Sequence, residues 1–193
     1  MLNEKLRNYK LILASGSPRR QQFLKDLGLD FEVRVREVVE TFPIHLKATE
    51  VTDYLAKLKA DAFDDLKPGE LLITSDTLVW HNDHGVGKPD DADHAFDILK
   101  SLSGSTHEVI TSVCFKTTDR VDIINDTTLV TFKPLSDELI RYYIDTYKPF
   151  DKAGAYGIQE WIGYVAVSRI EGSYTNVMGL PVDKVFDYLN ELT

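Results

Sequence analysis

Residues 9–28 read YKLILASGSPRRQQFLKDLG. The apolar side chains of residues 9–15 predict a short buried strand. Residues 18–27 predict a helix, because Ser17 is a favourable N-cap, Pro18 suits the first turn and Gly28 is a favourable stop. A buried strand that passes directly into a helix is the building unit of layered α/β folds, so this stretch predicts an α/β protein.

The rest of the chain alternates in the same way between strand and helix patterns. Apolar runs predict strands, and amphipathic spacing that ends at glycine or proline predicts helices. The predicted strands are 31–35, 71–80, 109–116, 121–132 and 162–170, and the predicted helices are 49–66, 92–102, 136–147 and 181–192. No repeat, low-complexity stretch or linker interrupts them, so we expect one domain over residues 1–193.

The composition excludes several classes of protein. Of the 193 residues, 43% are hydrophobic and 27% are charged, which is enough apolar material for a core. The net charge of -9 argues against general binding to nucleic acid or anionic membranes, because both are polyanions. No apolar run is long enough to span a membrane, and the N-terminal residues lack a signal-peptide core. The one cysteine, Cys114, cannot form an intrachain disulfide, so we expect a cytoplasmic protein.

Residues 14–20, ASGSPRR, place small side chains, hydroxyls and cations where the first strand joins its helix. Backbone N–H groups at a helix N-terminus attract anions, and Ser15 and Ser17 add hydroxyl donors. Arg19 and Arg20 add forked cations that match phosphate oxygens. The Gly-Lys-Ser/Thr ending of a Walker A loop is absent. The segment therefore predicts a phosphate site, with a plain strand–turn–helix connection as the alternative.

Six segments, in order along the chain, resemble the sequence blocks of the Maf family of nucleotide pyrophosphatases. They are LASGSPRR at 13–20, SDT at 75–77, GKP at 87–89, LSG and TH within 102–107, DKAGAYGIQ at 151–159, and GSY and NVMGLP within 172–181. The resemblance implies a mixed, elongated sheet flanked by helices, with two lobes around a central cleft, and a frequent homodimer. YGIQ at 156–159 is similar to the subfamily that acts on dTTP and UTP, whereas the subfamily that prefers 7-methyl-GTP differs there.

Two acidic residues are candidates for the chemistry itself. Asp76 follows the apolar run of residues 71–74, so we expect it at the carboxyl end of a buried strand, where α/β sheets bind ligands. A carboxylate there can orient or deprotonate a water or bind a metal, and a cap on the next turn is the alternative. The resemblance implies that Asp76 is the proton acceptor and that Glu40 occupies an acidic position of the family. Glu40 and Asp76 are therefore the expected ligands of a divalent cation, Mg²⁺ or Mn²⁺.

Three lysines are further candidates for phosphate binding. Lys88 lies between Gly87 and Pro89, a placement that predicts a fixed loop. Lys59 matches a lysine of the family pattern, and Lys152 lies in the segment that precedes the YGIQ block. The alternative for any one of these lysines is a solvated surface position.

The resemblance assigns substrate discrimination to Arg19, Thr77 and Gln159. The side-chain amide of Gln159 can both donate and accept a hydrogen bond, as the N3–H and carbonyl groups of thymine and uracil require. Glu160 follows where related members often have glycine, and we expect its side chain to turn outward.

Together these residues and the resemblance imply a nucleoside triphosphate pyrophosphatase. It would convert dTTP or UTP, and modified pyrimidine nucleotides, to the monophosphate and pyrophosphate with the help of the divalent cation. We expect a nucleotide as its partner, and neither nucleic acid nor a membrane. The alternatives are a non-catalytic nucleotide-binding regulator of cell division and septum formation, with which the family is also associated, and a 7-methyl-GTP pyrophosphatase. The combination of Asp76, Glu40 and Lys88 favours the enzyme, because carboxylates beside a phosphate site repel the ligand unless a metal is present.

Overall fold

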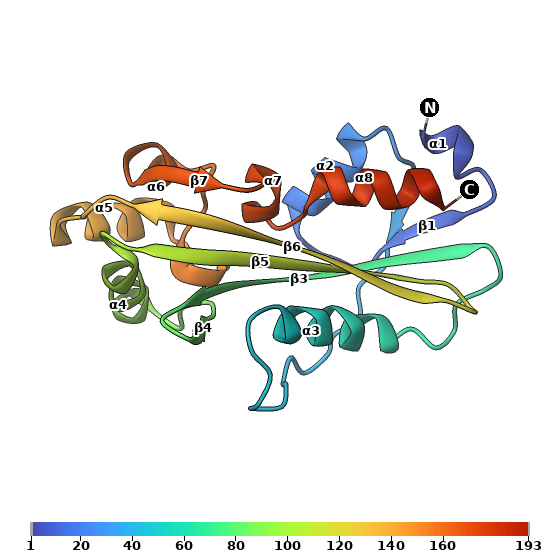
Figure 1. Ribbon diagram of the computed structural model, residues 1–193, viewed down its shortest axis with the longest axis horizontal. Helices are drawn as coiled ribbons and strands as arrows, with labels where there is room; N and C mark the ends of the chain where they lie inside the picture. Colours follow the sequence, from blue (N-terminus) through green and yellow to red (C-terminus); the bar gives the residue numbers. More distant parts are fainter. Residues whose placement is uncertain (1, 193) are drawn as a thin grey trace.

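The computed structural model describes residues 2–192, which form a mixed β-sheet flanked by helices (Figure 1). Within that range the sheet has seven strands in the order β2-β1-β3-β5-β6-β7, and β4 pairs with β3. The strands are β1 Lys10–Leu13, β2 Phe31–Val33, β3 Glu70–His81, β4 His84–Val86, β5 Thr106–Lys116, β6 Val121–Phe132 and β7 Val167–Glu171. β1 pairs in parallel with β2 and β3, and the other pairs are antiparallel. The predicted α/β class with a mixed, elongated sheet is confirmed.

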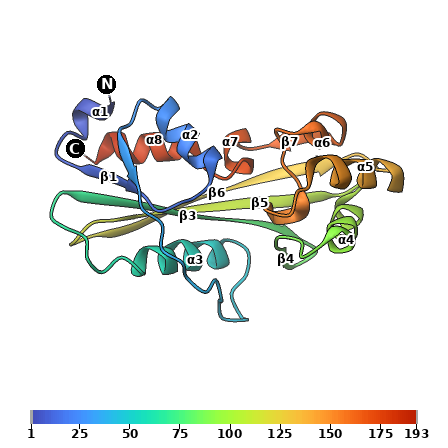
Figure 2. The same ribbon diagram turned by 180° about the vertical axis from the view of Figure 1, so that it is seen from behind.

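Helices cover both faces of this sheet. They are α1 Leu2–Lys5, α2 Pro18–Asp26, α3 Thr49–Asp61, α4 Ala92–Leu102, α5 Asp137–Tyr147, the 3-10 turn η1 Ala153–Ala155, α6 Trp161–Val165, α7 Tyr174–Val177 and α8 Val182–Glu191. At the β1 end, α2 and α8 lie on one face and α3 on the other, whereas α4 and α5 lie at the far end of the long strands (Figures 1 and 2). None of the helices within residues 2–192 has the length and apolar character needed to span a membrane.

The alternation of side chains along β1 and β3 divides the core into layers. Leu11, Leu13 and Ile73 belong to the cluster that packs against α2 and α8. Ile12 and Leu72 belong to the cluster on the opposite face, which packs against α3. A third cluster fills the far end around α4 and α5. Because successive residues of a strand point to opposite faces, odd-numbered residues of this part of β3 face α2 and even-numbered residues face α3.

Most of the predicted elements are confirmed, with ends that shift by a few residues. α4 has the predicted bounds, and its N-cap Asp91 accepts a hydrogen bond from the backbone N–H of His94. Ser136 caps α5 in the same way, because its side chain accepts a hydrogen bond from the backbone N–H of Leu139. The predicted helix 49–66 is too long: α3 ends at Asp61, because the chain leaves the helix to bury Phe63, which is 1% exposed.

The predicted strand 162–170 is wrong in its first half, where α6 forms instead. The amide of Ala166 donates to the carbonyl of Ile162 at 2.8 Å, and the buried side chain of Ile162 packs into the core around α4 and α5. An apolar run of this length fits a buried strand or a buried helix equally well, and here the tertiary packing favours the helix. Other short elements that the patterns did not predict are α1, β4, η1 and α7.

Candidate active site

Two adjoining cavities lie between the α2 end and the α4 end of the molecule. The cavity beside α7, here the α7 cavity, has a volume of about 360 Å³ and includes apolar walls from Leu55, Val79 and Met178. The cavity beside the β1–α2 loop, here the loop cavity, has a volume of about 590 Å³ and is lined by residues 14–20. Both cavities are lined by Ser17, Arg19, Arg20, Glu40, Lys59, Lys88 and Asp151. Most of the candidate residues therefore meet in one cleft.

The cleft follows a free edge of β3. β1 stops pairing with β3 at Ile73, and β4 begins to pair with it at Val79. Between these points no strand within residues 2–192 lies beside this edge of β3, so side chains from both faces of the sheet reach the cleft. Asp76 lies within this stretch, in the middle of β3 and paired across to Ser112 of β5. The expectation that Asp76 ends its strand is wrong: β1, not β3, ends here, because antiparallel pairing with β5 continues to Trp80 and pairing with β4 carries β3 to His81.

Asp76 faces α3, because even-numbered residues of this part of β3 point to that side of the sheet. There it contacts a lysine. Nζ of Lys59, in the last turn of α3, lies 2.6 Å from Oδ1 of Asp76 and 3.1 Å from Oε1 of Glu40. Burial raises the pKa of Asp76 above its ordinary value, although the nearby ammonium of Lys59 opposes the rise. The three side chains form a carboxylate–ammonium–carboxylate group on one wall of the cleft.

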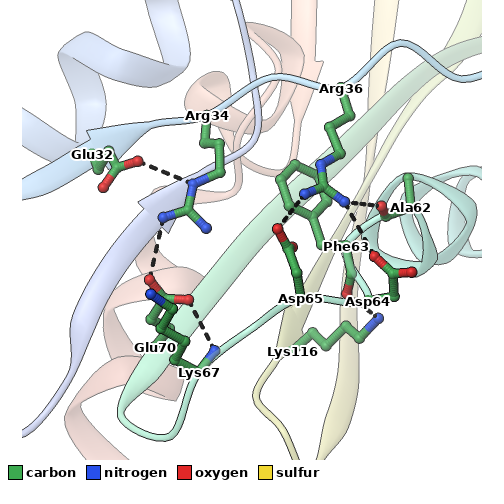
Figure 3. A network of polar contacts seen from close by, with 10 residues as sticks. All are labelled: Glu32, Arg34, Arg36, Ala62, Phe63, Asp64, Asp65, Lys67, Glu70 and Lys116. Atoms are coloured by element: carbon green, nitrogen blue, oxygen red, sulfur yellow. Dashed lines mark hydrogen bonds and ion pairs between the residues drawn. The ribbon is translucent and has the colours of Figure 1, made fainter.

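The segment that carries Glu40 has no regular structure and is anchored by two arginines. Arg34 forms an ion pair with Glu70, and Arg36 forms one with Asp65 (Figure 3). The nitrogen–oxygen distances are 3.2 Å and 2.6 Å. The guanidinium of Arg36 also lies 4.6 Å from the ring centroid of Phe63. These contacts fasten residues 34–36 to the α3–β3 connection, and so position the residues that follow them at the loop cavity.

The neighbouring arginines of α2 have different surroundings. Arg20 makes four hydrogen bonds, to Gly179 O at 2.8 Å, Ser75 O at 2.9 Å, Thr77 Oγ1 at 3.0 Å and Ser15 Oγ at 3.4 Å. Burial lowers its pKa to about 10, so it stays a cation at neutral pH. The four bonds tie Arg20 to the β1–α2 loop, to β3 and to the loop after α7, which makes it a structural link as well as part of the cleft wall.

Arg19 is freer than Arg20. Its Nε donates to Met178 O at 3.2 Å, its Nη1 lies 3.9 Å from Oδ2 of Asp151, and its side chain is 31% exposed. Most of its guanidinium can therefore face a ligand. Asp151 was not singled out by sequence reasoning, and its signal was its place at the start of the DKAGAYGIQ block.

The two serines of the loop lie as predicted at the helix start, with one difference. The backbone N–H of Ser17 donates to Oγ of Ser15 at 3.3 Å. Ser17 occupies the N-cap position of α2, but its own hydroxyl makes no capping bond, so the predicted side-chain cap is wrong. Because the cap position is extended and faces both cavities, the hydroxyl of Ser17 is available to a ligand.

Lys88 and Thr77 complete the cleft wall. The carbonyl of Gly87 accepts a hydrogen bond from Gly154 N at 3.0 Å, which fixes the loop before Lys88. The exposed ammonium of Lys88 has no hydrogen bond or ion pair with residues 2–192 and is free to bind an anion. Thr77 faces α2, where its Oγ1 accepts from Arg20 and lies 3.0 Å from Oγ1 of Thr111.

The turn at residues 157–160 lies beside the cleft rather than in its wall. Gln159 lines neither cavity, and its Nε2 packs 3.2 Å from the position that a Cβ on Gly157 would take. The prediction that Glu160 turns outward is wrong. Its carboxylate points inward, accepts a hydrogen bond from the hydroxyl of Tyr143 and lies 3.1 Å from Nζ of Lys152. Burial of these partners explains the inward turn, because each needs a polar contact.

The residues present fit a divalent cation that is shared with a substrate. No group of three or more histidine, cysteine, aspartate or glutamate side chains within residues 2–192 could by itself hold a metal. Asp76 and Glu40, however, already converge on one cation, the ammonium of Lys59. Mg²⁺ is typically held by one or two carboxylates together with phosphate oxygens, so two carboxylates at a phosphate-sized cleft suffice.

Comparison with known proteins identifies the family. The family model described as "Maf-like protein" matches residues 10–192. The chain belongs to the Maf family. A Maf protein of Flavobacterium johnsoniae, named "dTTP/UTP pyrophosphatase", is 63% identical over 193 residues. The match covers 100% of both chains. One of Bacteroides thetaiotaomicron with the same name is 47% identical over 189 residues, which are 97% of this chain and 98% of that protein.

Two solved structures have a fold similar to that of this Maf chain, although their sequence identity to it is low. The Ham1 protein of Staphylococcus aureus has a TM-score of 0.56 at 14% identity, covering 95% of this chain and 100% of that one. A HAM1 protein of Coxiella burnetii has a TM-score of 0.51 at 15% identity, covering 95% and 99%. These neighbours support the mixed α/β fold of the Maf chain, a sheet flanked by helices.

Proposed function

We propose that this Maf chain hydrolyses dTTP and UTP to the nucleoside monophosphate and pyrophosphate. The proposal is supported by the name shared by relatives that match it over 98% or more of their length. The observation that carries it is the Lys59–Asp76 pair, a buried carboxylate 2.6 Å from an ammonium, in the same cleft as Arg19 and Lys88. A cleft with this composition can bind an anionic ligand and activate a water in one place.

The loop cavity binds the triphosphate. Backbone N–H groups at the start of α2 and the hydroxyls of Ser15 and Ser17 donate to phosphate oxygens, as helix N-termini do for anions. The cations supply charge neutralisation; they are Arg19, Arg20, Lys59 and Lys88. Since phosphoryl transfer depends mainly on positioning and on neutralising charge, this ring of donors contributes most of the catalysis.

Asp76 is the general base. Its carboxylate takes a proton from the water that attacks the α-phosphorus, the bond to the oxygen bridging the α and β phosphorus atoms breaks, and pyrophosphate leaves. Lys59 holds the carboxylate in its ionised form against the effect of burial and fixes its orientation. Glu40 and Asp76 would hold Mg²⁺ or Mn²⁺, which when bound neutralises charge on the phosphate oxygens.

The α7 cavity receives the base. Its apolar walls suit a planar ring, and Arg19 and Thr77 lie on its polar side. Gln159 lies in the adjoining turn and lines neither cavity, so its predicted pairing with the N3–H and a carbonyl group of thymine or uracil would require this turn to move toward the base. Modified pyrimidines that keep these groups are substrates as well.

The test is product analysis with Mg²⁺ or Mn²⁺ and a panel of nucleotides: dTTP, UTP, CTP, ATP, GTP and 7-methyl-GTP. We expect monophosphate and pyrophosphate from dTTP and UTP well ahead of the others. Preferred cleavage of 7-methyl-GTP would overturn the base assignment. Failure to cleave any triphosphate with either metal would overturn the enzymatic proposal in favour of a nucleotide-binding regulator.

A further inference from the structure

Lys152 differs from the other cations of the cleft in its position. Arg19, Lys59 and Lys88 line both the loop cavity and the α7 cavity, whereas Lys152 lines the α7 cavity alone. Only Lys152 among these cations is therefore confined to the cavity whose walls are apolar. A cation that served the phosphates would be expected at the loop cavity, beside Ser15.

Two carboxylates hold the ammonium of Lys152 in place. Its Nζ lies 2.8 Å from Oδ1 of Asp151 and 3.1 Å from Oε1 of Glu160, and its side chain is 10% exposed. An ammonium has three N–H donors, so two contacts leave one for a ligand. Because its charge is already compensated, Lys152 adds little to the attraction of a triphosphate, but it retains a directed hydrogen-bond donor.

Glu160 is itself fixed by a buried phenol. The hydroxyl of Tyr143 donates to its carboxylate and accepts from the backbone N–H of Gly157 at 3.0 Å. Burial raises the pKa of Tyr143 well above its ordinary value, so the phenol stays protonated and can donate. Tyr143 is 0% exposed and Glu160 forms a backbone turn bond to Gly157 O at 2.9 Å. The donor on Lys152 is thus held by groups that do not move freely.

The α7 cavity has the size and walls of a base site. Val79, Val109 and Tyr156 supply apolar contact, and the volume of about 360 Å³ is at the lower end of that of small-molecule sites. A base in this cavity presents its ring substituents to a wall that includes Lys152. Thymine and uracil carry a carbonyl oxygen at C4, where cytosine carries an amino group that cannot accept from an ammonium.

We propose that Lys152 is a specificity-determining residue that donates a hydrogen bond to the C4 carbonyl of a pyrimidine-2,4-dione, and that Glu160 is the residue that positions it. This assignment rests on the proposed function, since it concerns which triphosphate the cleft accepts. It replaces the expected phosphate contact of Lys152 with a base contact. It also gives Glu160 a role, because its carboxylate holds the ammonium of Lys152.

The experiment compares the wild type with a double variant, Lys152→Met with Glu160→Gln, which removes donor and carboxylate together and leaves no unpaired buried charge. We expect the ratio of kcat/KM for UTP to that for CTP to fall by about ten- to a hundredfold, as for the loss of one hydrogen bond to a charged group. Inhibition by inorganic tripolyphosphate, which has no base, should be unchanged. Lys88→Met is the control. It should weaken inhibition by tripolyphosphate and lower kcat/KM for UTP and for CTP by the same factor.

The outcome that overturns the proposal is the reverse pattern. If the double variant weakens tripolyphosphate inhibition and leaves the UTP-to-CTP ratio unchanged, Lys152 is a phosphate ligand. Glu160→Gln alone keeps an acceptor for Tyr143, should fold if the double variant does not, and should lower the same ratio severalfold. If the wild type cleaves no triphosphate, the proposed function fails, and calorimetric binding of UTP and CTP to the same variants then decides this inference separately.

Discussion

Nζ of Lys59 lies 2.6 Å from Oδ1 of Asp76, across the interface between α3 and β3. The contact joins the last turn of a helix to the middle of a strand and sits where β1 no longer covers the edge of β3. A buried carboxylate and a cation at hydrogen-bond distance form the chemical centre of the cleft.

Asp76→Asn removes the proton acceptor and keeps the shape of the side chain. We expect kcat to fall by about 10² to 10⁴, the usual contribution of a general base, while dTTP still binds. Single-turnover hydrolysis and equilibrium binding measure the two effects. Asp119→Asn, in the exposed turn between β5 and β6, is the control and should change neither. Wild-type turnover by Asp76→Asn would show that another group accepts the proton.

Arg19 and Arg20 are neighbours in sequence with different roles. Arg20→Lys loses a fork that bonds to four groups at once, so the free energy of unfolding should fall by about 2–4 kcal/mol in urea denaturation. Arg19→Lys should cost less than about 1 kcal/mol, because its contacts are fewer and partly exposed. Its effect should be a higher KM for dTTP. Equal losses of stability would contradict this division.

The metal requirement tests the paired carboxylates. A chelator should abolish hydrolysis, and added Mg²⁺ or Mn²⁺ should restore it. Glu40→Gln removes one of the two proposed ligands, so the Mg²⁺ concentration for half-maximal activity should rise by about tenfold. Glu37→Gln, in the same segment, is the matched control. An unchanged Mg²⁺ dependence in Glu40→Gln would remove Glu40 from the metal site.

His107 should make stability depend on pH. Burial lowers its pKa from 6.5 to about 3, and its Nε2 lies 2.8 Å from the hydroxyl of Tyr156. The unfolded chain takes up the proton more readily, so this contribution is complete above pH 6.5 and is lost as the pH falls towards 3. At pH 5 the loss is about 2 kcal/mol.

Urea denaturation at pH 7.5 and pH 5 measures this change. His107→Gln keeps a polar partner for Tyr156 but does not titrate, so its stability should differ less between the two conditions. His45→Gln alters an exposed side chain and should behave as the wild type. The same pH dependence in His107→Gln would assign it to other groups.

Gly163 is a position where a side chain does not fit. A Cβ there would lie 1.7 Å from the carbonyl oxygen of Ile158, whereas one on Gly16 would meet nothing within 4 Å. Gly163→Ala should therefore lower the free energy of unfolding by at least about 3 kcal/mol, and Gly16→Ala by no more than about 0.5 kcal/mol. Thermal melts of both variants check this. A stable Gly163→Ala would mean that α6 can shift away from Ile158.

Local patterns were sufficient for the elements whose ends carry their own signals. α4 and α5 begin at capping side chains, Asp91 and Ser136, within one residue of the predicted helix starts. The strand–loop–helix unit at residues 9–28 follows from its apolar run, its proline and its glycine. The segment 162–170 carried no such signal, and its apolar residues were compatible with either structure, so packing of Ile162 against a distant part of the chain determined α6.

Side-chain contacts between distant segments could not be predicted in the same way. The inward turn of Glu160 depends on Tyr143, a residue of α5 that no local pattern connects to it. The sequence named both Lys152 and Gln159 as site residues, but it could not tell that Lys152 lines the α7 cavity whereas Gln159 lines neither cavity. Energies of such contacts arise only when the elements are assembled, because each partner is solvated in the separated segments.

The sequence by itself determined the family, the α/β class and the residue types that could handle a triphosphate, since these are properties of local order along the chain. Because successive side chains of a strand point to opposite faces, the sequence also determined that Asp76 and Thr77 lie on opposite faces of the sheet. Only the tertiary structure decided that both reach one cleft. The physical reason is that β1 ends at Leu13 while pairing with β5 carries β3 onward, which leaves a free strand edge between two lobes.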